Sequence, residues 1–332
     1  MGTIHYTRLF AVALLSMVAP YAVSQSQQPG ATEETIKLHT DLVVVDAQVL
    51  NRKTGVVVNG LAREHFTLFE DGVKQQVTHF SQDKLPLSIV LLLDVSGSVQ
   101  PVIDQIRDQG LNALNELKPG DEVALMAFGT WATLLQDFTK DRQLIATKIA
   151  AIEFMGPWIR EATYIHEAVY AAAKHLASAS NPDSRRIIII ITDNLSNQPV
   201  GGGHSQTEAN EALLESGVVV SGLVVGDFNA VVDEYRKKGF TIEDSIGSHV
   251  ADTGGVALQV GKDDAVTKLA NLIERLRTRY SLGYTPLNEK RDGKFRKIKL
   301  TIAPDIERRE GGVAIVARKG YYTRSPVSTK TK

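Results

Sequence analysis

The chain has 332 residues, of which 43% are hydrophobic and 23% charged, and it contains no cysteine. Its 37 lysines and arginines against 38 aspartates and glutamates leave a formal net charge of −1. This composition excludes a disordered, collagen-like or disulfide-stabilised chain, and it offers no basic surface for nucleic acid. Any metal site must use oxygen or nitrogen ligands.

The N-terminus has the pattern of a secretory signal peptide. An apolar run extends from Leu9 to Val23, and the small residues Ala22 and Ser24 are suited to cleavage after residue 24. A retained membrane anchor is the alternative, but a span needs about 20 apolar residues and Pro20 interrupts this run. We therefore expect an exported protein, periplasmic or secreted, with residues 1–24 removed and no membrane span left after cleavage.

A polar leader over residues 25–35 precedes the first β-rich segment, residues 36–82. The run from Leu42 to Leu50 predicts a strand. From Phe66 to Phe80 the apolar residues alternate around an Asp71-Gly72 turn, which predicts a β-hairpin.

The pattern changes over residues 85–279, where short apolar runs alternate with segments of helical period. Ile187 to Ile191 is apolar on both faces, as a parallel strand covered by helices on both sides must be. The expected fold class is therefore α/β with a doubly wound, mostly parallel sheet. The expected strands are Ser88–Leu93, Val123–Phe128, Ile187–Ile191 and Val218–Val225, and the expected helices are Val102–Leu117, Leu144–Ile152, Tyr164–Ala177, Glu208–Ser216 and Val266–Arg279.

The β character returns over residues 280–324, with Asp-Gly and Gly-Gly turns between short strands. This segment and residues 36–82 are each too small to bury a core alone, so we expect them to form one small β-domain from both chain ends. Residues 325–332 are expected to be a disordered tail.

Oxygen-bearing side chains follow two of the predicted strands. Leu91 to Leu93 leads into Asp94, Ser96 and Ser98, and a second apolar run ends at Thr192 and Asp193. Because ligands of a doubly wound sheet bind beyond the carboxyl ends of its strands, these side chains are expected at one crevice. Hydroxyl and carboxylate oxygens favour a hard divalent cation, Mg²⁺ or alternatively Mn²⁺ or Ca²⁺, with coordination positions left open.

On these motifs the chain resembles von Willebrand factor type A domains with a metal-ion-dependent adhesion site. The resemblance covers about residues 85–279, and it implies a set of five ligands: Asp94, Ser96, Ser98, Thr163 and Asp193. The β-rich flanks on an exported chain are also similar to a type A family best known from acidobacteria. The resemblance further implies that a partner's acidic group would complete the ion's coordination shell.

Two positions depart from the family pattern. Thr163 follows Arg160-Glu161-Ala162, where the family usually has glycines, and Asn194 stands where it often has glycine. Taken singly, the two serines could also be ordinary caps of the following helix, and Asp193 could simply end its strand.

Other motifs are incomplete. His166-Glu167 begins like a zinc-protease motif, but Tyr170 stands where the second histidine is required. His166 and His175 are expected on the solvent side or edge of one helix. Gly201 to His204 lacks the spacing of a phosphate loop and is interpreted as a rim of the crevice.

The sequence therefore predicts a non-enzymatic, cation-dependent binding or adhesion module whose partner is an unknown protein or extracellular polymer with an acidic group. Two alternatives remain open. One is a Mg²⁺-dependent phosphoryl hydrolase with Asp94 as the nucleophile, although Ser96 stands where such enzymes generally have a second aspartate. The other is a structural envelope protein with a silent metal site.

Overall fold

The structure is a computed structural model that describes residues 42–82, 85–154, 162–199, 201–239 and 241–323. The predicted signal peptide, leader and C-terminal tail lie outside these residues. Within them, no helix combines the length and the apolar character that crossing a membrane requires.

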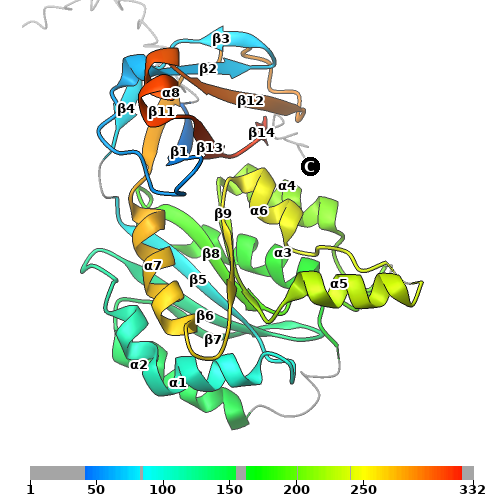
Figure 1. Ribbon diagram of the computed structural model, residues 1–332. Helices are drawn as coiled ribbons and strands as arrows, with labels where there is room; N and C mark the ends of the chain where they lie inside the picture. Colours follow the sequence, from blue (N-terminus) through cyan, green and yellow to red (C-terminus); the bar gives the residue numbers. More distant parts are fainter. Residues whose placement is uncertain (1–41, 83–84, 155–161, 200, 240, 324–332) are drawn as a thin grey trace, which may run out of the picture. The chain divides into compact units, whose positions relative to one another are not determined.

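A mostly parallel sheet forms the centre of the α/β region (Figure 1). Its strands are β5 (Leu87–Asp94), β6 (Glu122–Phe128), β7 (Ala132–Thr139), β8 (Arg185–Thr192), β9 (Val219–Val225) and β10 (Ala257–Val260). Their spatial order is β10-β9-β8-β5-β6-β7. Only β7 runs antiparallel to its neighbour within this sheet. The predicted doubly wound, mostly parallel α/β sheet is confirmed.

Helices cover both faces of this sheet (Figure 1). One face packs against α1 (Gln100–Leu114), α2 (Arg142–Ala150) and α7 (Ala265–Arg277), and the other against α3 (Ile165–His175), α4 (Gln206–Ser216) and α6 (Gly247–Thr253). The side chains of β8 alternate between the two apolar layers: Ile189 and Ile191 face the first, and Ile188 and Ile190 face the second. A strand buried on both faces explains its unbroken isoleucine run.

The flanking β-region combines strands from both ends of the described chain. Its strands are β1 (Val43–Asn51), β2 (Phe66–Glu70), β3 (Val73–Gln75), β4 (His79–Ser81), β11 (Tyr280–Tyr284), β12 (Phe295–Ile302), β13 (Val313–Ala317) and β14 (Gly320–Tyr322). They form two four-stranded antiparallel sheets, in the orders β13-β1-β11-β4 and β14-β12-β2-β3. Asp71 and Gly72 join β2 to β3 with positive φ angles of 48° and 83°, as a tight hairpin turn requires.

The remaining helical segments within the described residues are η1 (Arg63–His65), η2 (Ala151–Phe154), η4 (Leu176–Ser178), α5 (Phe228–Lys237) and α8 (Pro304–Glu310). Some predicted bounds differ from the structure. The helix expected over Val102–Leu117 begins at Gln100 and ends at Leu114. The helix expected from Glu208 begins at Gln206, because Ser205 and Glu208 form a capping box at its amino end.

Candidate functional site

The loop after β5 presents hydroxyl groups at the carboxyl end of the sheet. Val95 and Val99 are buried and anchor this loop, while Ser96 is half-buried and Ser98 is exposed between them. The Val95 amide also donates a hydrogen bond of 3.0 Å to the carbonyl of Phe128, the last residue of β6. Apolar residues facing inward thus force the serines to face solvent.

Asp94, Ser96, Ser98 and Asp193 lie together. The Ser96 amide donates to Asp94 Oδ1 over 2.9 Å, and Ser96 Oγ lies 3.2 Å from Ser98 Oγ. Ser98 Oγ in turn donates to Asp193 Oδ2 over 2.5 Å. Since Asp193 directly follows β8, the neighbour of β5, the carboxyl ends of two adjacent parallel strands supply all four side chains.

Thr163 lies on a separate loop that is fixed to the segment after β8. The Thr163 amide donates to Asn197 Oδ1 over 2.7 Å, and the Thr163 carbonyl accepts from the Asn197 amide over 3.1 Å and from Ser196 Oγ over 3.0 Å. Its side chain is buried, and among the described residues no hydrogen bond joins it to the other four predicted ligands. Ser196 and Asn197 were not predicted as partners of Thr163, because the sequence carries no periodic signal in this loop.

Asp94 is fully buried, and both of its carboxylate oxygens accept hydrogen bonds. Thr192 Oγ1 donates to Asp94 Oδ2 over 2.7 Å. Burial raises the pKa of the Asp94 carboxyl to about 6, although the bonds from Thr192 and Ser96 lower it and the nearby Asp193 carboxylate raises it. A negative charge at this position is costly, so the site favours neutralisation by a proton or a cation.

The donor set fits a hard divalent cation. Neighbouring oxygens in an octahedral shell with metal–oxygen distances of about 2.1 Å lie about 3 Å apart, close to the separation of the two serine Oγ atoms. The described residues contain no group of three or more histidine, cysteine, aspartate or glutamate side chains arranged for a metal. Hydroxyls and two carboxylates make up the set here, and oxygen ligands of this kind suit Mg²⁺, Mn²⁺ or Ca²⁺.

Thr192 and Asn194 end or follow the second strand at the expected crevice and support the site, but neither was predicted as a metal ligand. Asn194 has a φ of 66°, in the left-handed region where asparagine is tolerated better than most residues. This conformation explains how asparagine can stand where type A domains often have glycine. The signal for Thr192 was its hydroxyl, the first polar group after five isoleucines, because a buried hydroxyl requires a partner.

His166 and His175 of α3 are both half-buried, which fits the edge position expected from the sequence. The sequence did not predict that His166 Nδ1 lies 3.0 Å from Nε2 of the buried His249 on α6. The rim residue His204 stacks on Tyr170 and places its Nδ1 2.7 Å from Glu167 Oε2. These contacts tie α3 to α6 and to the segment after Gly201 to Gly203.

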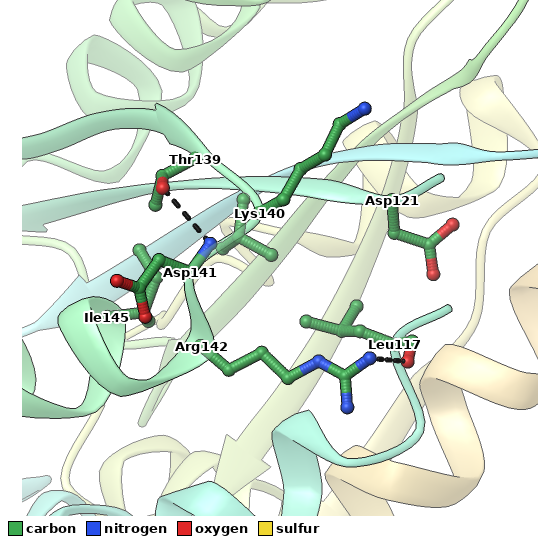
Figure 2. A pocket seen from close by; sticks show the side chains of 8 residues that line it. Leu117, Asp121, Thr139, Lys140, Asp141, Arg142 and Ile145 are labelled. Atoms are coloured by element: carbon green, nitrogen blue, oxygen red, sulfur yellow. Dashed lines mark hydrogen bonds between the residues drawn. The ribbon is translucent and has the colours of Figure 1, made fainter. Parts of the chain in front are cut away.

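A small hollow lies away from this site, at the amino end of the parallel strands (Figure 2). Arg142 donates there to the Leu117 carbonyl, and the Asp141 amide donates to Thr139 Oγ1 over 3.1 Å. Asp121, also in its lining, is paired with Arg277, and the hollow is separate from the predicted ligands.

Comparisons with known proteins identify the α/β region. Residues 89–196 match the sequence family described as von Willebrand factor type A domain. The chain therefore contains such a domain, and the resemblance predicted from the sequence is confirmed at this level. The matched residues include all five predicted ligands. No curated protein sequence matches the chain.

Solved structures that match the chain include two from bacteria and one from a mussel. BatB of Bacteroides thetaiotaomicron is 19% identical, with 57% of this chain and 98% of that chain covered and a TM-score of 0.43. An aerotolerance-related membrane protein of Bacteroides fragilis is 17% identical, with 57% of this chain and 99% of that chain covered and a TM-score of 0.39. Proximal thread matrix protein 1 of the mussel byssus was solved with a zinc-occupied MIDAS (metal-ion-dependent adhesion site) motif. It is 16% identical, with 62% of this chain and 49% of that chain covered and a TM-score of 0.46. The match thus spans about half of the mussel protein.

Proposed function

We propose that this protein is an exported binding module that recognises an acidic group through a divalent cation held in a metal-ion-dependent adhesion site. The ligands would be Asp94, Ser96, Ser98, Thr163 and Asp193. The observation that carries the proposal is the hydrogen bond of 2.5 Å between Ser98 Oγ and Asp193 Oδ2, which brings two loops from neighbouring strand ends to one point.

The arrangement of the oxygens supports an ion with an open coordination position. Two of the proposed ligands are carboxylates, and the others are neutral hydroxyls, so a divalent cation here would keep positive charge and attract a carboxylate from outside. Ser98 is exposed and Asp193 half-buried, which leaves this side of the cluster accessible to a partner. We propose Mg²⁺ as the ion because the set consists of hard oxygen donors.

We further propose that the site binds rather than catalyses. A phosphoryl hydrolase would need Asp94 as an accessible nucleophile, but Asp94 is 0% exposed and both its oxygens accept hydrogen bonds. Turnover of generic phosphate esters with Mg²⁺, lost in Asp94→Asn, would favour the hydrolase instead.

The proposal of export rests on the signal-like segment of residues 1–24. The narrower resemblance to an acidobacterial family stays a prediction. Fractionation of the source cells with an antibody against the α/β region tests the location. A protein found in the periplasm or medium supports export, and one confined to the cytoplasm contradicts it.

Calorimetric titration with Mg²⁺ and Mn²⁺ tests the metal site. We expect one ion per wild-type chain and no specific heat in Asp94→Ala. Because loss of Asp94 could disturb folding, Ser98→Ala provides a second variant at an exposed position, where weaker binding is expected in a folded protein. The matched control is Asp183→Ala, which removes an exposed carboxylate elsewhere.

Equal heats in the wild type and in both site variants would refute the metal site.

Binding to an acidic polymer, tested with polyglutamate in Mg²⁺ and then in EDTA, addresses the partner. Retention that survives the chelator would instead favour docking through ordinary protein surface, as in a structural protein with a silent site.

A further inference from the structure

We propose that Asn194 is a positioning residue that holds the Asp193 turn in place by clamping it to the segment before α6. The inference rests on the proposed metal site, because it concerns how one carboxylate of that site is held. It assigns a task to the Asn194 side chain that the backbone conformation alone does not require.

The backbone at this position could be formed by glycine. A φ of 66° suits glycine at no steric cost, and asparagine adopts it less readily. If conformation were the only requirement, the side chain of Asn194 would be dispensable. Instead it is buried, with 2% of the residue exposed.

The buried amide of Asn194 makes two hydrogen bonds to one short segment. Asn194 Oδ1 accepts from the Ile246 amide over 2.9 Å, and Asn194 Nδ2 donates to Asp244 Oδ1 over 2.7 Å. The donor and the acceptor of the amide are therefore both engaged, and they fix the orientation of the side chain. Asp244 Oδ1 also accepts from the Gly247 amide over 2.8 Å, at the amino end of α6.

The segment that Asn194 holds is itself packed firmly. Ile246 is 1% exposed and belongs to the apolar layer between the sheet and α6. It lies over Gly222 of β9, where an added Cβ would come within 2.5 Å of Ile246 Cδ1. Asn194 is thus bonded to a fixed anchor, not to a freely moving loop.

The same residue reaches the proposed ligands through its main chain. The Asn194 amide donates to Thr192 Oγ1 over 3.1 Å, and Thr192 Oγ1 donates to Asp94 Oδ2. Asp193 lies between Thr192 and Asn194, so both of its neighbours are fixed by hydrogen bonds. The side-chain clamp therefore fixes the backbone next to Asp193, and the main chain of Asn194 reaches Asp94 through one intermediate, Thr192.

Removal of residues that orient metal ligands typically lowers metal affinity 10- to 100-fold. We expect Asn194→Gly, which permits the backbone conformation but removes both side-chain bonds, to raise the Kd for Mn²⁺ about tenfold. Amide hydrogen exchange gives a readout without metal. The Leu195 amide, bonded to Asp193 Oδ1 over 2.9 Å, and the Ile246 amide should exchange faster in this variant.

Two variants of Asp244 separate the hydrogen bond from the charge. Asp244→Ala and Asp244→Asn remove the same negative charge, but only asparagine retains an oxygen that can accept from Asn194 Nδ2. We expect Mn²⁺ to bind Asp244→Asn more tightly than Asp244→Ala. Asn210→Ala is the matched control, because Asn210 bonds to His249 and Asp252 and not to the turn.

The inference is overturned if Asn194→Gly binds Mn²⁺ with the wild-type Kd and keeps wild-type protection at Leu195, or if the two Asp244 variants bind equally. It is also overturned if Asn210→Ala weakens Mn²⁺ binding as much as Asn194→Gly does, since the effect would then reflect stability. A wild-type protein that binds no Mn²⁺ would refute the proposed metal site as well, whereas the other outcomes leave that site standing.

Discussion

Ser98 and Asp193 are 95 positions apart in the chain, yet Ser98 Oγ donates a hydrogen bond of 2.5 Å to Asp193 Oδ2. Both residues follow parallel strands that pair directly, β5 and β8. The carboxyl ends of such strands meet at one edge of the sheet, so the contact follows from topology. Any ligand shared by these two side chains must therefore bind at that edge.

Replacing Thr192 with valine should destabilise the protein. The change leaves Asp94 Oδ2 buried without its partner and removes the acceptor of the Asn194 amide. We expect a loss of about 1–3 kcal/mol in the free energy of unfolding, measured by urea titration in EDTA. Thr192→Ser, which retains the hydroxyl, is the control and should lose less. A loss in Thr192→Ser, which keeps the hydroxyl, as large as that in Thr192→Val would contradict the assignment of the effect to the two hydrogen bonds.

Breaking the buried ion pair between Arg277 and Asp121 should lower the free energy of unfolding more than breaking an exposed ion pair does. Arg277 Nη2 lies 2.6 Å from Asp121 Oδ2, and the two side chains are 2% and 0% exposed. Arg277→Met leaves a buried carboxylate without its cation, so we expect a loss of about 3–5 kcal/mol in unfolding free energy. The control is Arg236→Met, whose partner is the exposed Asp233, and a change below about 1 kcal/mol is expected there. Equal effects would contradict this account.

Acid should destabilise the fold through His249. Its Nδ1 faces Asn210 Oδ1, which can only accept, so Nδ1 carries the proton and Nε2 accepts from His166. Burial, and secondarily the charge of His166, lower the pKa of His249 to about 3. Burial also lowers the pKa of His166, against which the charge of Glu243 acts.

The sign of the pH effect follows from the folded and unfolded states. Below an ordinary pKa of about 6.5 the unfolded chain binds a proton that folded His249 does not bind, so stability falls as the pH drops from 6.5 towards 3. By pH 5 the contribution of His249 to this loss should reach ~2 kcal/mol, while protonation of Asp94, with its raised pKa of about 6, acts in the opposite direction. Urea titrations at pH 7 and pH 5 should show a smaller difference for His249→Gln than for the wild type, and the exposed His79→Gln should behave like the wild type. An unchanged difference in His249→Gln would refute this assignment.

The sequence was sufficient to predict the central strands and the residues that follow them. The isoleucine run of β8 and the leucine run of β5 are apolar on both faces, which is typical of a covered parallel sheet. The polar residues after such runs are then confined to the sheet edge where ligands bind. For this reason four of the five predicted ligands, all except Thr163, could be grouped from strand patterns alone.

Other elements were missed. The helix α5 (Phe228–Lys237) has apolar residues at helical spacing, Phe228, Val231, Val232 and Tyr235, but this short stripe was not singled out from the sequence, and none of its residues is buried. Irregular pairing with β6 around Leu125 disturbs the alternation of β7. The clamp of Asn194 joins positions 50 and 52 residues apart through single polar contacts, and such contacts leave no periodic trace in the sequence.

The most direct test of the metal site is a crystal structure of the protein grown with Mn²⁺ and measured for anomalous scattering. We predict one strong anomalous peak within about 2.5 Å of both Ser96 Oγ and Ser98 Oγ, on the side of Asp193. Crystals of Asp94→Ala grown under the same conditions should lack this peak. Wild-type crystals in saturating Mn²⁺ with no peak at this position would contradict the account.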